Sequence, residues 1–183
     1  MKQTIKLVAA PTGIQPGDYV GAAYPVGGAP ATASAVLMVD RAASGGWVIN
    51  LAWLCASPVE EIKSDTNRFA DAAALLAPAQ ADTPMMTMGY PTHPVEGMLW
   101  RPDWSAPVKI VAEGFGTVVR HPAPAGWIAR GSWENGARTA RFEISNWPAL
   151  AAQKRLGVAI WQGAGQQRAG LKSVTPDWIA LTE

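Results

Sequence analysis

A stretch rich in Met, Pro and Trp, residues 84–104, carries the side chains that are best suited to chemistry. It holds four of the six Met, two of the nine Trp, four of the fifteen Pro and one of the two His residues. Proline restricts the backbone, so a loop of this composition can hold a side chain in one place. A Met thioether packs against flat aromatic surfaces and also ligates soft metals. The stretch is therefore either core filler, the commoner role of Met beside Trp, or a grip on a large flat ligand.

Other kinds of site find little support. Nucleophilic catalysis needs a base, and neither His93 nor His121 lies in a recognisable triad motif. Two His residues without a nearby third ligand do not make a zinc site. The single Cys55 excludes an internal disulfide, an iron–sulfur cluster and covalent Cys-x-x-Cys-His haem attachment. Gly114-Phe115-Gly116 lacks the third Gly and the following helix of a phosphate-binding loop.

Composition limits the classes of protein further. The 183 residues are enough for one domain, 1–183, with a good core. Charged residues make up 16%, below the roughly 25% usual in soluble proteins, so the surface either contains much Ala, Gly, Pro, Ser and Thr or is partly covered by a partner. The net charge of +1 has no basic cluster, so nucleic-acid binding is not expected. No apolar run approaches the ~20 residues of a membrane span. Residues 1–10 do not read as a signal peptide, which predicts a cytoplasmic protein or a missing leader.

Short alternating segments between Gly- and Pro-rich turns predict an all-β fold. Strands are expected over residues 2–9, 35–39, 47–54, 95–104, 108–111, 127–133, 138–144, 156–161 and 174–181. Residues 69–76 suit either a helix or a buried strand, whereas 11–30 and 58–68 read as loops. Asn135-Gly136 predicts a tight hairpin, and residues 147–155 predict a helix with Asn146 as N-cap. Together these elements predict an antiparallel, immunoglobulin-like β-sandwich with one short helix near its C-terminal third.

Eight of the nine Trp residues divide into two groups. Those within strand patterns are expected in the core between the sheets: Trp47, Trp53, Trp133, Trp161 and Trp178. Those near loops could line a pocket: Trp100, Trp104 and Trp127. Because aromatic rows on β-sandwiches can stack on sugar rings, a carbohydrate- or ligand-binding module without haem is the alternative function.

Several motifs, taken in order, resemble the haem-binding γ subunits related to ethylbenzene dehydrogenase. The first are Phe69-Ala70-Asp71-Ala72-Ala73-Ala74 and Pro84-x-x-x-Met88-Gly89-x-Pro91-x-x-Pro94-Val95-x-x-x-Leu99-Trp100. The next are Ala112-Glu113-Gly114-x-Gly116-Thr117 and Gly131-x-Trp133-x-Asn135-Gly136. The last are Val158-Ala159-Ile160-Trp161-x-Gly163 and Lys172-Ser173-Val174-x-x-x-Trp178. The resemblance covers most of residues 47–181 and rests on order and spacing, since no single motif is highly specific.

The resemblance implies iron ligation by a Met and a Lys. Met88 matches the family's Met, with Met86 as its rival. After residues 112–117, where the Lys was expected, the sequence instead has Val118-Val119-Arg120-His121. Arg stays protonated and is a poor ligand, whereas His is a good one. We therefore predict Met88 and His121 as ligands, Lys109 and His93 as alternatives for the second ligand, and Trp100 and Trp127 as cofactor contacts.

The resemblance also implies a function. The family's γ subunits carry one b-type haem without covalent attachment and perform no substrate chemistry. They relay electrons between the iron–sulfur β subunit of a complex, whose α subunit holds molybdenum, and a soluble acceptor such as a cytochrome c. Relatives are generally exported, which implies a periplasmic location.

Overall fold

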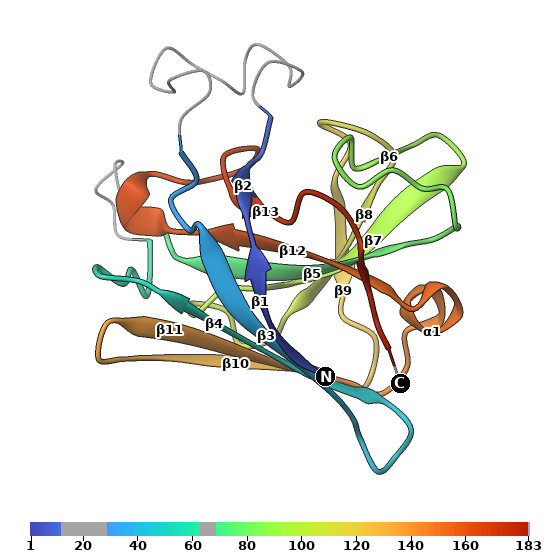
Figure 1. Cartoon of the computed structure of the whole chain (residues 1–183), viewed down its shortest axis with the longest axis horizontal. Coiled ribbons are helices and arrows are strands. Elements are labelled where there is room, and N and C mark those ends of the chain that lie inside the picture. Colours follow the sequence, from blue (N-terminus) through green and yellow to red (C-terminus); the bar gives the residue numbers. More distant parts are fainter. Residues whose placement is uncertain (12–28, 63–68, 183) are drawn as a thin grey trace.

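The computed structural model describes residues 1–11, 29–62 and 69–182, and these form two antiparallel sheets packed face to face (Figure 1). The five-stranded sheet has the order β1 (Lys2–Lys6), β3 (Ser34–Arg41), β4 (Trp47–Leu54), β11 (Ala137–Ile144) and β10 (Trp127–Glu134). The main path of the nine-stranded sheet is β2 (Val8–Ala9), β13 (Ser173–Val174), β12 (Arg155–Trp161), β5 (Ala72–Pro78), β7 (His93–Trp100), β8 (Val108–Ala112) and β9 (Val119–Pro122). Two further short strands join it: β14 (Ile179–Ala180) pairs with β12, and β6 (Gly89–Tyr90) pairs with β7. The predicted antiparallel β-sandwich is confirmed.

The main core lies between the two sheets. Leu37, Ile49 and Phe142 from the five-stranded sheet are fully buried, as are Leu75 and Ile160 from the nine-stranded sheet, and all five belong to one apolar cluster. Side chains alternate between the two faces of a strand, so the regular burial pattern of β4 reflects one face in this core and one nearer solvent.

Strand β5 departs from that alternation because all seven of its residues are buried. Ala73, Leu75 and Ala77 face the core between the sheets. Ala72, Ala74 and Leu76 face a second apolar cluster on the outer side of the nine-stranded sheet. This double burial shows that the sandwich carries a third layer, built from loops, and explains why residues 69–76 had suited either a buried strand or a helix.

Several boundaries differ from the predictions. Strand β7 ends at Trp100, and the edge strand β9 was not predicted. The predicted closing strand over 174–181 is two short strands, β13 and β14. The helix α1 spans Pro148–Gln153, and its N-cap is Trp147 rather than Asn146. Figure 1 shows α1 at one end of the sandwich. The predicted loops 11–30 and 58–68 fall largely outside the described residues. None of the helices in the described ranges is long and apolar enough to cross a membrane.

Candidate functional site

A cavity of about 650 Å³ opens on the outer face of the nine-stranded sheet, away from the core between the sheets. Its floor comes from Ala72 and Leu76 of β5, Leu99 of β7, Ile110 of β8 and Ala159 of β12. Ligand sites in proteins usually have volumes of about 300–1,000 Å³ and mostly apolar walls. The two Ala side chains on neighbouring strands leave room above the sheet, so the floor suits a flat, apolar molecule.

Two loops form the upper walls of this cavity. One contains Met88 and the other is the segment 167–172, which follows the short 3-10 helix Gly163–Gly165. Trp161 donates a hydrogen bond from Nε1 to the carbonyl of Ala169 at 3.0 Å, which ties the second loop to β12. Gln166 and Ala169 have φ angles of 59° and 49°, in the left-handed region that side chains rarely occupy. Such backbone conformations cluster at ligand sites.

The Met88 loop has a fixed backbone. The amide of Met88 donates to the carbonyl of Met85 at 2.9 Å, and its own carbonyl accepts from the amide of Gly114 at 2.9 Å. Met88 has φ 60°, a strained value for a side chain of this size, and the following Gly89 has φ 81°. A Cβ on Gly89 would lie 2.5 Å from the carbonyl oxygen of His93, so only glycine fits there. The backbone therefore fixes the point from which the Met88 side chain reaches the cavity wall.

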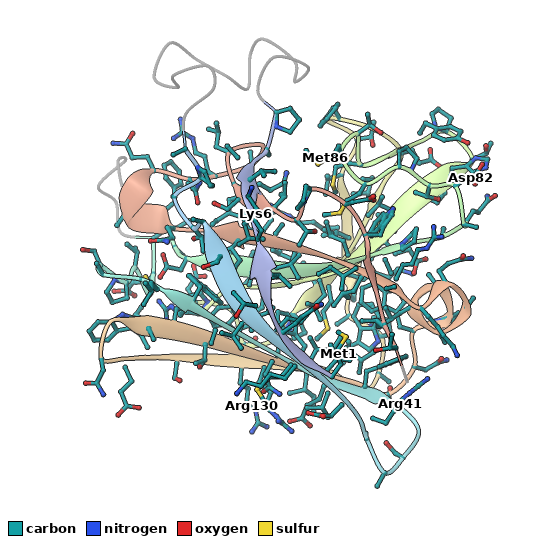
Figure 2. All side chains as sticks on the ribbon, viewed as in Figure 1. Met1, Lys6, Arg41, Asp82, Met86 and Arg130 are labelled. Carbon is teal, nitrogen blue, oxygen red and sulfur yellow. The ribbon has the colours of Figure 1, made fainter. Side chains whose placement is uncertain are left out.

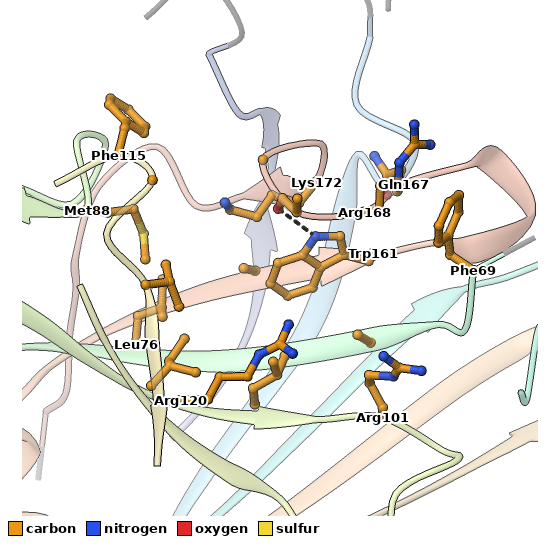
Figure 3. A pocket seen from close by; sticks show the side chains of 18 of the residues that line it. Phe69, Leu76, Met88, Arg101, Phe115, Arg120, Trp161, Gln167, Arg168 and Lys172 are labelled. Carbon is orange, nitrogen blue, oxygen red and sulfur yellow. Dashed lines mark hydrogen bonds between the residues drawn. The ribbon is translucent and has the colours of Figure 1, made fainter. Parts of the chain in front are cut away.

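Lys172 lies on the other loop and extends into the same cavity (Figure 3). Among the described residues, its Nζ has no hydrogen-bond or ion-pair partner, and its one close contact is the Trp161 ring at 5.6 Å. Burial lowers the pKa of the Lys172 ammonium from 10.5 to about 8. A partly buried amine without a partner is costly for a fold to keep, so its presence points to a ligand in the cavity. The lowered pKa also makes the neutral, metal-binding form of the amine easier to reach.

Three other residues predicted to contact the cofactor, Met86, Trp100 and Trp127, do not line the 650 Å³ cavity. Met86 is partly buried and borders a much smaller neighbouring cavity of about 10 Å³. Trp100 and Trp127 belong to the core between the sheets, with exposed fractions of 3% and 5%, and do not line the 650 Å³ cavity. The Trp that does line it is Trp161, which had been assigned to the core. Trp133, also predicted as core, is 39% exposed.

His121 is exposed on β9 and does not line the cavity. It pairs with Lys109, whereas the preceding Arg120 pairs with Ile110. Paired residues of an antiparallel ladder project from the same face of the sheet, and successive residues project from opposite faces. Ile110 forms part of the cavity floor, so Arg120 projects on the cavity side and His121 on the other side.

The two alternative second ligands are engaged elsewhere. Lys109 projects on the same side as His121, and its Nζ binds Oε1 of Glu96 at 2.9 Å. His93 stacks on Tyr90 and uses both ring nitrogens, with Nε2 at 3.3 Å from Asp82 and Nδ1 at 3.0 Å from the Thr92 hydroxyl. Of the residues predicted from the sequence, Met88 alone lines the large cavity.

The side-chain chemistry of the cavity fits haem. A thioether and an amine reach it from separate loops, and both are iron ligands when the amine is neutral. Apolar side chains of the floor and walls suit a porphyrin face. The lining includes Arg101, Arg120, Arg168 and Lys172 but no Asp or Glu among the described residues, which suits an anionic cofactor. Sequence reasoning missed Lys172, although the Lys172-Ser173-Val174 motif had been noted.

Comparison with known proteins found a relative with a similar sequence. The chain is 30% identical over 149 residues to the gamma subunit of chlorate reductase from Ideonella dechloratans. The alignment covers 76% of this chain and 61% of the relative, so the chain spans about three fifths of that protein's length. No family model matches the chain.

Proposed function

Because the chain belongs to the family of γ subunits related to ethylbenzene dehydrogenase, we propose that it is an electron-transfer subunit carrying one non-covalent b-type haem. When bound, haem supplies a reversible one-electron couple at its iron. The chain itself holds and orients the group and performs no substrate chemistry. The observation that carries this proposal is that Met88, on a hydrogen-bonded loop, and Lys172, whose Nζ has no partner among the described residues, line one cavity.

We assign Met88 and Lys172 as the two side chains that would hold the haem iron. The assignment follows the Met and Lys pair that the family resemblance implies, with Lys172 in place of the predicted His121. Met88 supplies a soft sulfur ligand, which raises the potential of a haem iron and suits an electron carrier. Lys172 must lose its proton to bind iron, and burial has already lowered its pKa to about 8.

The proposed partners follow from the same family. We propose that the chain accepts or delivers electrons through an iron–sulfur β subunit of a complex whose molybdenum α subunit performs the catalysis. A soluble carrier such as a cytochrome c exchanges electrons at the other end of the path. We propose the periplasm as its location, since members of this family are generally exported.

The test is the absorption spectrum of the purified full chain, with haemin added if the protein is colourless. We expect a Soret band that shifts reversibly on reduction, with a six-coordinate, low-spin spectrum. Met88→Leu and Lys172→Leu keep side-chain volume nearly constant, and each is expected to convert this spectrum to a five-coordinate or high-spin one.

Two matched controls separate ligands from neighbours. Met86→Leu lies in the same loop as Met88, and His121→Leu removes the ligand predicted from the sequence. Both variants are expected to keep the wild-type spectrum. A low-spin spectrum that survives Lys172→Leu and is lost in His121→Leu would reject the Lys172 assignment. A protein that binds no haem, but whose Trp fluorescence responds to glycans, would favour the alternative binding module.

A further inference from the structure

The cationic side chains of the cavity differ in how they are already engaged. Arg101 forms a two-point ion pair with Asp103, with Nε at 2.9 Å from Oδ1 and Nη2 close to Oδ2. Arg168 lies over the Phe69 ring at 4.5 Å and donates to the carbonyl of Gln166. Lys172 is assigned to the iron. Arg120 is therefore the lining cation that remains to be explained.

Arg120 has no ion pair or hydrogen bond from its guanidinium among the residues that the structure describes. Its guanidinium carbon Cζ lies 5.7 Å from the centre of the Trp104 ring. Arg101 lies over the same ring at 4.7 Å, so Trp104 holds two arginines beside each other. The pairing of Arg120 with Ile110 fixes its side chain on the cavity side of β9. Figure 3 shows its guanidinium extending toward Trp161.

The surroundings of Arg120 suit a carboxylate of the ligand. A guanidinium presents a planar pair of donors that matches a carboxylate with two parallel hydrogen bonds. Arg120 is exposed on an edge strand, so a carboxylate bound there keeps part of its hydration and avoids the cost of full burial. The described lining offers no acidic side chain that would compete for the same donors.

We propose that Arg120 binds a propionate of the haem and sets the rotational orientation of the ring between Met88 and Lys172. This inference rests on the proposed function, because it assumes that the cavity takes a porphyrin. Arg120 is a positioning residue: it contacts the periphery of the ligand and leaves the iron ligands in place.

The test compares two porphyrins on the haem-free full chain: protohaem, with two free propionates, and its dimethyl ester, which lacks both negative charges. Affinity is measured by Soret titration for wild type, Arg120→Gln and Arg130→Gln. Arg130 is the matched control because it is exposed on β10 of the five-stranded sheet and does not line the cavity. Figure 2 shows Arg130 on the opposite side of the molecule from Met86, which lies in the Met88 loop.

We expect Arg120→Gln to weaken protohaem binding roughly tenfold to hundredfold, as for other charge-assisted two-point contacts. Affinity for the dimethyl ester is expected to be equal in wild type and Arg120→Gln, and Arg130→Gln should match wild type for both porphyrins. Equal weakening for both porphyrins, or no weakening for either, would overturn the role of Arg120 while leaving the haem site in place. A wild-type chain that binds neither porphyrin would overturn the proposed function and this inference with it.

Discussion

Two cationic side chains, Arg138 and Lys172, show how differently this fold treats a charge taken out of water. Arg138 of β11 is fully buried and forms hydrogen bonds to two carboxylates: Nη2 and Nε lie 2.7 and 3.2 Å from Oδ2 of Asp71, and Nη1 lies 2.8 Å from Oε1 of Glu60. Lys172 is partly buried and has no such partner among the described residues. A buried charge whose hydrogen bonds are satisfied within the protein stabilises the fold, whereas a partly buried charge without such partners points to a ligand site.

The Arg138 cluster holds the two sheets together. Arg138 belongs to the five-stranded sheet, and Asp71 immediately precedes β5 of the nine-stranded sheet. The Asp71 carboxylate also accepts hydrogen bonds from the amides of Gly163 at 2.9 Å and Val59 at 3.2 Å. Asp71 thus anchors, through Gly163, the start of the loop that carries Lys172. The ion pair between Asp71 and Arg138 therefore also helps to position the loop of Lys172.

The largest expected effect comes from breaking the paired region. Asp71→Asn leaves the buried Arg138 without its main counter-charge and is expected to lower the free energy of unfolding by about 3–5 kcal/mol. Urea denaturation measures it. The control is a double-mutant cycle: Arg138→Met should cost much less in the Asp71→Asn background than in wild type. Additive costs would show that the two side chains do not interact.

A smaller effect is expected from Lys172 in the haem-free protein. Its pKa is about 8 when folded and 10.5 as an ordinary lysine. Between these pH values the unfolded chain binds more protons than the folded chain, so the stability of wild type rises with pH over this window. Relative to Lys172→Leu, wild type should gain ~1–3 kcal/mol between pH 7.5 and 10.5, allowing for partial exposure.

Urea denaturation of both proteins at several pH values measures this gain, because the titrations of other groups cancel in the difference. Lys6→Leu, at an exposed lysine of β1 that does not line the cavity, serves as the matched control for the loss of a lysine side chain. A flat difference for Lys172→Leu would mean that its ammonium is as well solvated as that of a surface lysine.

The smallest effect is expected from Glu60, the second carboxylate that binds Arg138. Glu60 binds the same guanidinium as Asp71, but its side chain is 57% exposed. Exposed ion-pair partners contribute little, so Glu60→Gln is expected to cost about 1 kcal/mol or less. Thermal denaturation of Glu60→Gln beside Asp71→Asn measures the contrast. If the two variants lose equal stability, the burial of a carboxylate does not determine how much its ion pair with Arg138 contributes to stability.

Much of the fold could be predicted because local signals agreed with the final structure. Residues 47–54 are an apolar run with Asn50 as its one polar residue, and they form β4 with the predicted bounds. Asn135 and Gly136 both have positive φ, as the two-residue hairpin turn between β10 and β11 requires. Strand β9 was missed because Val119–Pro122 is exposed at all four positions, so its sequence carries no buried face to reveal it.

The proposed ligands Met88 and Lys172 were harder to predict because they lie far apart in the sequence. Met88 stood out by its Pro- and Gly-rich loop. Lys172 gave no comparable signal, since burial of a lysine depends on which loops meet above the sheet. The predicted ligand His121 is one residue away from a position that lines the cavity. Successive residues of a strand project from opposite faces of the sheet, so Arg120 lies on the cavity side and His121 on the other side.

The fixed backbone around Met88 has a consequence for rate. Its amide, its carbonyl and the neighbouring Gly89 amide are all held by hydrogen bonds of 2.9 Å, so the backbone that carries the side chain has little freedom to shift. A metal centre whose ligands keep their positions when its charge changes by one unit has a small reorganisation energy. If Met88 holds the proposed haem, the hydrogen-bonded backbone at this residue would favour rapid electron exchange in both directions.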